Sequence, residues 1–193
     1  MVRAAQATGF ATDGKRFVSC GAWEAGCDVL DLGRDLVTER VTSAWPDGPD
    51  GTPITSTPPV KKLFQRLGAP APQGHFPYSD DLRVSWAVGD GGHSLYVSLI
   101  LLANGSERVI HRFPSRADAS LQPIVLEGVT LSPDGGVLEL DAFAAQGGMG
   151  FDVALVNLHA EAAALFRTAG DAFADKAKHA ESLAHTAAPS FIE

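Results

Sequence analysis

The sequence lacks long hydrophobic runs and has no excess of basic residues. Its longest apolar stretch runs from Val97 to Ala103 and is interrupted by Ser98, whereas a membrane-spanning helix needs about 20 apolar residues. We therefore expect no membrane span. Lys and Arg number 15 against 23 Asp and Glu, the net charge is −8 and no basic stripe is visible. Such a surface cannot neutralise many phosphates, so nucleic acid is not an expected partner.

The spacing patterns of metal and catalytic sites are also missing. The six histidines form no His-x-x-x-His or His-Glu-x-x-His motif, and no Gly-x-Ser-x-Gly elbow or Walker-type loop occurs. We expect no metal, no cofactor and no catalytic residue. The alternative that stays open is a hydrolase-like enzyme whose site forms only in the fold, with His111 or His93 against an Asp. A half-buried structural histidine explains His111 as well.

What the sequence does contain is a globular composition with strand-like patterns. Hydrophobic residues make up 45% of the 193 residues, and short alternating or β-branched runs recur between turn residues. The fold class is therefore predicted to be mainly β, with antiparallel strands. Nine runs carry the pattern: 15–21, 27–32, 36–41, 82–88, 93–103, 106–113, 124–131, 137–143 and 151–158. Asn104-Gly105 is a strong hairpin signal, and a two-residue turn there would place Ser98 opposite His111.

Two segments interrupt the strand pattern. Eight of the twelve prolines lie in a connection over residues 44–79, where the spacing of apolar residues predicts a short helix over 60–67. Near the C-terminus, residues 159–187 are rich in helix formers and predict a long helix that packs on the β-rich part, with Gly170 as a point where it could break. We accordingly assign residues 1–158 to one β-rich domain, 159–187 to the helix and 188–193 to a tail.

The only two cysteines, Cys20 and Cys27, bracket a turn-like stretch and could face each other across a hairpin within disulfide range. Two separate buried thiols are the alternative. A disulfide would favour an extracytoplasmic location, periplasmic or secreted. Residues 1–10 lack the apolar core of a signal peptide, but a removed signal would leave the same start, so this says little about the compartment.

Residues 9–32 and 130–158 resemble each other. Each has Asp-Gly, an apolar strand, a glycine-containing loop, then Gly-[Cys/Phe]-Asp-Val and a second strand. Asp-Gly supplies the positive φ angles of a hairpin turn, so an internal repeat and two convergent hairpins are both open. The segment Leu131-Ser-Pro-Asp-Gly135 followed by Val-Leu-Glu-Leu resembles the hairpins of TolB-like β-propeller repeats.

The opening pattern, with Gly9-Phe10, Asp13-Gly14 and the strand over 16–20 before Asp28-Val29-Leu30, is similar to a bacterial family of predicted secreted proteins of unknown function. The two resemblances cover about 55 residues. They imply a sheet or sandwich of propeller-like hairpin units and export, and they carry over no catalytic residue. A closed propeller needs at least four blades of four strands, which about ten strands cannot supply.

These observations predict a non-enzymatic extracytoplasmic binding or structural module. Trp45, Tyr78 and Trp23 are the candidate binding-surface residues, because exposed aromatic side chains in connections often serve recognition. A third reading is a subunit that binds another protein or a second copy of itself through its C-terminal helix, whose later part carries mostly alanine on its apolar stripe.

Overall fold

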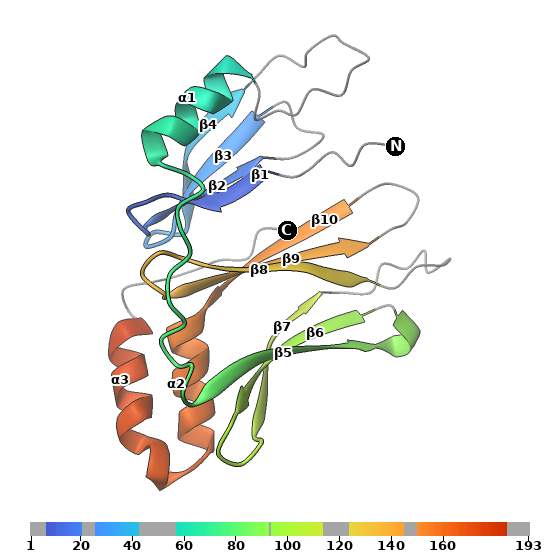
Figure 1. Ribbon diagram of the computed structural model, residues 1–193, viewed down its shortest axis with the longest axis vertical. Coiled ribbons are helices and arrows are strands. Elements are labelled where there is room, and N and C mark those ends of the chain that lie inside the picture. Colours follow the sequence, from blue (N-terminus) through green and yellow to red (C-terminus); the bar gives the residue numbers. More distant parts are fainter. Residues whose placement is uncertain are drawn as a thin grey trace. The chain divides into compact units, whose positions relative to one another are not determined.

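The computed structural model describes residues 7–20, 26–42, 57–92, 94–113, 124–144 and 150–184 (Figure 1). Ten strands in three antiparallel sheets form in these ranges, together with a short helix and C-terminal helices, which confirms the predicted mainly β fold class. The chain divides into two compact units, residues 1–73 and 74–193. This boundary falls inside the proline-rich connection, not at residue 158, because the strands on its two sides bury side chains in separate clusters.

The first unit is a four-stranded meander with one helix against it (Figure 1). Its strands follow one another in the sheet as β1 (Ala7–Phe10), β2 (Arg16–Cys20), β3 (Gly26–Asp31) and β4 (Leu36–Thr42). The helix α1 (Pro58–Leu67) begins with prolines, which suit a first helical turn, and ends at Gly68 with a φ of 60°. The predicted helix over 60–67 is confirmed.

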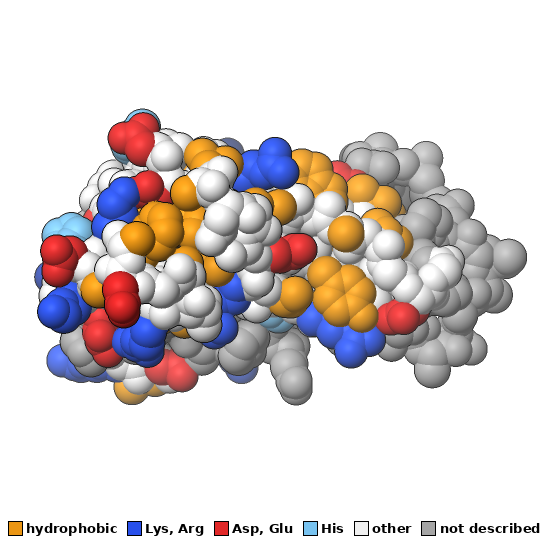
Figure 2. Space-filling view, turned by 90° about the horizontal axis from the view of Figure 1, so that it is seen from below, with side chains coloured by type: hydrophobic (Ala, Val, Ile, Leu, Met, Phe, Trp, Pro, Cys, Tyr) orange, Lys and Arg blue, Asp and Glu red, His pale blue; other side chains and the backbone are white. Residues whose placement is uncertain are grey.

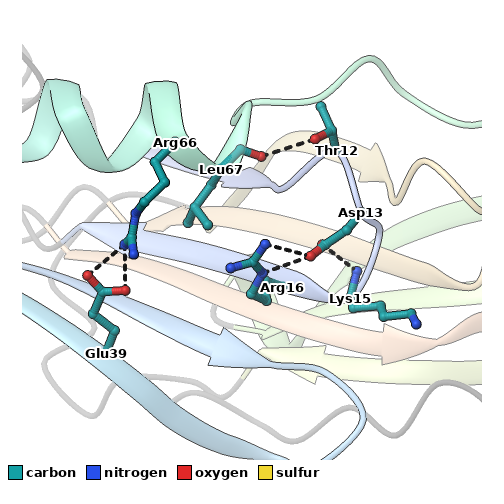
Figure 3. A network of polar contacts seen from close by, with 7 residues as sticks. All are labelled: Thr12, Asp13, Lys15, Arg16, Glu39, Arg66 and Leu67. Atoms are coloured by element: carbon teal, nitrogen blue, oxygen red, sulfur yellow. Dashed lines mark hydrogen bonds and ion pairs between the residues drawn. The ribbon is translucent and has the colours of Figure 1, made fainter.

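The helix α1 buries one apolar side against the sheet and is tied to it by polar contacts. Val60, Leu63 and Leu67 pack in one cluster with residues of β2 and β3. Arg66 of α1 forms an ion pair with Glu39 of β4, with Nη2 2.5 Å from Oε2, and the Thr12 hydroxyl donates to the Leu67 carbonyl at 3.2 Å (Figure 3). These contacts join the helix to the edge strand and to the β1–β2 turn.

The second unit contains two three-stranded sheets and a helical hairpin. One sheet has the order β5 (Leu82–Gly89), β6 (Ser94–Leu101), β7 (Glu107–Phe113); the other has the order β10 (Gly150–Asn157), β9 (Val137–Ala144), β8 (Val125–Leu131). Both contribute to a single apolar cluster that includes the first C-terminal helix, α2 (Leu158–Thr168). Arg108 of β7 forms an ion pair with Glu161 of α2, with Nε 2.5 Å from Oε2, which places α2 on the core side of that sheet.

The predicted single C-terminal helix is wrong, because the chain reverses after α2. Gly170 has a φ of 103°, which ends the regular helix, and a short 3₁₀ turn leads into α3 (Ala174–Ala184). Ala177 and Ala180 of α3 are buried in the core of the same unit, and Asn157 donates to the Ala184 carbonyl at 3.0 Å. The alanine stripe therefore packs within its own chain.

The two resembling segments fold into the same corner. In the first, Ala11 N–H donates to Arg16 O at 2.9 Å and Gly14 N–H to Ala11 O at 3.0 Å; in the second, Ser132 N–H donates to Val137 O at 2.9 Å and Gly135 N–H to Ser132 O at 2.8 Å. Both glycines have positive φ angles, 66° and 78°.

The match between the segments continues through their third strands. Leu32 N–H donates to Lys15 O and Leu158 N–H donates to Gly136 O, both at 2.9 Å. Counted from these corners, the registers of β2 with β3 and of β9 with β10 are the same. The resemblance seen in the sequence is therefore a shared three-stranded geometry, one copy in each unit.

Candidate functional site

The cysteine pair is a disulfide, which confirms the predicted bond. Cys20 and Cys27 are directly opposite residues of β2 and β3, with their Cα atoms 4.1 Å apart. Both are buried in the cluster beneath α1. The bond therefore closes the end of this hairpin inside the core of the first unit. Trp23, within the loop it closes, and Trp45 lie outside the described residues.

A buried polar cluster surrounds His159, at the start of α2. Its Nδ1 is 2.7 Å from the hydroxyl of Tyr78, and the rings meet edge to face. Tyr78 is only 7% exposed and His159 only 6%. The structure thus places Tyr78 in the core and not on a binding surface. Phe166 packs edge to face on the other side of the tyrosine ring.

Burial sets the protonation of this pair. It raises the pKa of Tyr78 to about 12 and lowers the pKa of His159, an effect that the charge of Asp134 opposes and the nearby His179 reinforces. At neutral pH both groups are uncharged. The protonated hydroxyl can then donate to Nδ1, which puts the ring hydrogen of His159 on Nε2.

The Asp-Gly corner between β8 and β9 lies beside this histidine. Ser132 donates its hydroxyl hydrogen to Asp134 Oδ1 at 2.6 Å and accepts from Val137 N–H at 2.9 Å. Asp134 Oδ1 also accepts from Gly136 N–H at 3.1 Å. A Cβ on Gly136 would come within 3.2 Å of His159 Nε2, so the absence of a side chain there lets the corner and the ring approach.

This cluster contains serine, aspartate and histidine, but its hydrogen bonds are those of a structural joint. The fully buried Ser132 hydroxyl is engaged as donor and as acceptor, and His159 Nδ1 is occupied by Tyr78. A serine nucleophile needs its hydroxyl free to donate to a general base and reach a substrate. The arrangement stabilises the junction of the connection, the β8–β9 corner and α2.

The second candidate constellation, Ser98 with His111, does not form. His111 is opposite Val97, and a bulge follows, so that Ser98 is opposite Val109. Since Val97 and Ser98 are consecutive in a strand, their side chains leave opposite faces of the sheet. The predicted two-residue turn is wrong: Leu101 N–H donates to Ser106 O at 2.8 Å, which leaves four residues in the loop.

His111 does have an acidic neighbour, Asp152 of β10. Burial lowers the pKa of His111 and the charge of Asp152 partly offsets this. The ring of His111 also packs edge to face on Phe113, with centroids 4.4 Å apart. The pair therefore lies where β7 approaches β10. His93 is outside the described residues.

The described residues form neither a metal site nor a helix that could span a membrane. In ranges 7–20, 26–42, 57–92, 94–113, 124–144 and 150–184, no group of three or more His, Cys, Asp and Glu residues could hold a metal ion. None of the helices in those ranges has the length and apolar character of a membrane span.

The contact between Tyr78 and His159 was not predictable from the sequence pattern, because the two residues are 81 positions apart. One signal pointed to part of it. The Asp-Gly corner is predicted by the sequence, and Asn157 caps α2 by accepting from Ala160 N–H at 3.0 Å. Together these place His159 and Asp134 at the same end of the β9–β10 pair, where Val137 is opposite Asn157.

Comparisons with family models, curated proteins and solved structures find no match to this chain. The resemblances to TolB-like hairpins and to secreted proteins of unknown function stay predictions.

Proposed function

We propose that this chain is a non-enzymatic binding or structural module that works outside the cytoplasm, in the periplasm or as a secreted protein. The observation that carries the proposal is the disulfide between Cys20 and Cys27 in the core beneath α1. Structural disulfides form and persist in oxidising compartments and are rare in the cytosol. A buried bond of this kind suits a small sheet-and-helix unit that must remain folded without cytoplasmic chaperones.

The absence of enzymatic activity is inferred from the polar groups of the second unit. Ser132 lies in the same cluster as His159 and Asp134, and its hydroxyl is buried and doubly hydrogen-bonded. Ser98, the serine expected beside His111, leaves the other face of the sheet. The alternative of a hydrolase-like enzyme would require Ser132 to exchange its structural partners for a substrate.

A serine-reactive fluorophosphonate probe tests this inference on the intact, oxidised chain. We expect no labelling. Labelling that disappears in Ser132→Ala and persists in Ser98→Ala would overturn the proposal in favour of the hydrolase alternative. Both substitutions remove a buried hydroxyl, so Ser98→Ala controls for a general loss of structure.

The compartment is tested by fractionating cells that contain the protein at its natural level. We expect the chain in the extracytoplasmic fraction. A chain found only in the cytoplasmic fraction would contradict this part of the proposal, whatever the outcome of the probe experiment.

A further inference from the structure

An exposed apolar row follows β5, the edge strand of its sheet. Trp86 is 57% exposed and Val88 is 49% exposed, and with the half-buried Val84 they point to one face because they alternate along the strand. On the face of the molecule drawn in Figure 2, hydrophobic side chains reach the surface in small groups between charged and other polar ones. A narrow row of this kind suits a strand as a partner better than a broad flat surface.

The backbone N–H and C=O groups of Val84, Trp86 and Val88 are on the open edge of the sheet, as the hydrogen-bond pattern shows. Leu102 N–H donates to Asp81 O at 2.8 Å, and the register of β5 with β6 continues without a bulge to Gly89. Hydrogen-bonded and non-hydrogen-bonded pairs alternate in an antiparallel ladder. The N–H and C=O groups of Val84, Trp86 and Val88 therefore point away from β6, and among the described residues no strand pairs with them.

Edge strands are usually protected from pairing with other chains by proline, lysine or a bulge. The strand β5 reads Leu-Arg-Val-Ser-Trp-Ala-Val-Gly and has none of these protections. Arg83 is its only charged residue. An open edge with exposed apolar side chains is a template for strand addition.

We propose that this edge binds a second copy of the chain by antiparallel pairing of β5 with β5, with the two-fold axis at Trp86. This register places the two Trp86 side chains beside each other and Val84 opposite Val88 of the other copy. It also sets exposed Arg83 opposite Gly89 and therefore next to Asp90 of the other copy, so opposite charges meet at both ends. A parallel pairing in register would instead bring the two Arg83 side chains together.

The carboxylate of Asp90 is fixed by contacts within its own chain and is still exposed to a second copy. Its Oδ2 accepts from the Ser94 hydroxyl at 2.7 Å and lies 3.2 Å from Arg112 Nη2. Its carboxylate remains 54% exposed at the end of the strand. The charges and the apolar row therefore select the same register.

The register is tested with cysteines on the other face of β5. In the proposed dimer Ser85 is opposite Ala87 of the second copy in a non-hydrogen-bonded pair, the type of pair that Cys20 and Cys27 form with Cα atoms 4.1 Å apart. We expect a mixture of Ser85→Cys and Ala87→Cys proteins to give disulfide-linked dimers on mild oxidation. Each variant alone should stay unlinked. Linking in a single variant, or none in the mixture, would overturn the register and the proposal with it.

Sedimentation of the unmodified chain tests the surface itself. We expect dimers whose dissociation constant rises about tenfold or more in Trp86→Lys, because the two lysines would meet at the axis. Val109→Lys is the matched control, since Val109 is 51% exposed on β7, and it should change the constant less than about twofold. Both replaced side chains are exposed, so both variants should keep the native circular dichroism. A chain that stays monomeric up to about 1 mM, or a dimer that both variants weaken equally, would overturn the proposal.

Discussion

Asp13 and Asp134 hold the same place in two hairpin corners: each carboxylate accepts the backbone N–H of the residue two positions later, Lys15 at 2.9 Å and Gly136 at 3.1 Å. The two corners differ in the second partner that each carboxylate binds. Asp13 binds the exposed Arg16 at 2.8 Å, whereas Asp134 accepts from the buried Ser132 hydroxyl.

This difference predicts that removing the two carboxylates lowers the free energy of unfolding by different amounts. Asp134→Ala should lower the free energy of unfolding by about 1–2 kcal/mol, because a buried hydroxyl loses its acceptor. Asp13→Ala, where water can replace the carboxylate, should cost less than about 1 kcal/mol. Urea unfolding of both variants measures the two values. Equal losses would show that the buried serine does not depend on Asp134.

The Tyr78–His159 hydrogen bond should stabilise the second unit measurably. Tyr78→Phe keeps the ring contacts with Phe166 but leaves a buried imidazole nitrogen without its partner, which should cost about 1–2 kcal/mol. Tyr96→Phe is the matched control, because its hydroxyl makes an exposed contact of 3.3 Å with Asp90 and should cost less than about 0.5 kcal/mol. A loss of the same size in both variants would contradict the assigned role of the pair.

The three-stranded geometry shared by β1–β3 and β8–β10 predicts a second position for a disulfide. Asp141 and Val153 are opposite residues of β9 and β10 at the place that Cys20 and Cys27 occupy in β2 and β3. We expect Asp141→Cys with Val153→Cys to oxidise spontaneously and to raise the free energy of unfolding by about 3 kcal/mol on the chain-entropy account. Differential alkylation and urea unfolding check both points, with Asp141→Cys alone as the control. Failure of the pair to oxidise would show that the shared register does not extend to these residues.

The carboxyl group of Asp141 should make stability depend on pH. Burial raises its pKa to about 6, so between about pH 4 and 6 the folded state binds more protons than the unfolded state does. The free energy of unfolding should therefore fall as pH rises through this window. Asp141→Asn should remove the fall and stabilise the chain at pH 7 by about 1–2 kcal/mol, a range reduced because the group is partly exposed. An unchanged pH profile in Asp141→Asn would refute the prediction.

The sequence predicted the local elements well because their causes are local. Asp-Gly corners, the apolar spacing of Val60 to Leu67 and the cysteines seven positions apart each encode a turn, a helix face or a cross-strand pair. The short strand β1 was missed, since Ala-Thr-Gly-Phe has no alternating pattern. The four-residue loop at Asn104 was missed because the side chain of Asn104 accepts Ser106 N–H and Gly105 takes a φ of 73°, which a sequence pattern does not distinguish from a tighter turn.

These local patterns do not predict contacts between segments that are distant in the sequence. Nothing near Tyr78 in the sequence indicates that its hydroxyl meets a histidine on α2, so its place in the proline-rich connection predicts an exposed aromatic instead. The reversal at Gly170 had a visible signal, yet whether a glycine breaks a helix depends on what the following segment can pack against. Here it packs on α2, with Arg167 and Glu181 3.0 Å apart across the hairpin.

A count of free thiols on protein taken from its own cells tests the central claim most directly. The chain is alkylated during lysis, unfolded, reduced and alkylated again with a heavier reagent, so mass spectrometry reads the state that Cys20 and Cys27 had in the cell. A module that works outside the cytoplasm should carry no free thiol before reduction and two after it. Two free thiols before reduction would contradict the extracytoplasmic assignment.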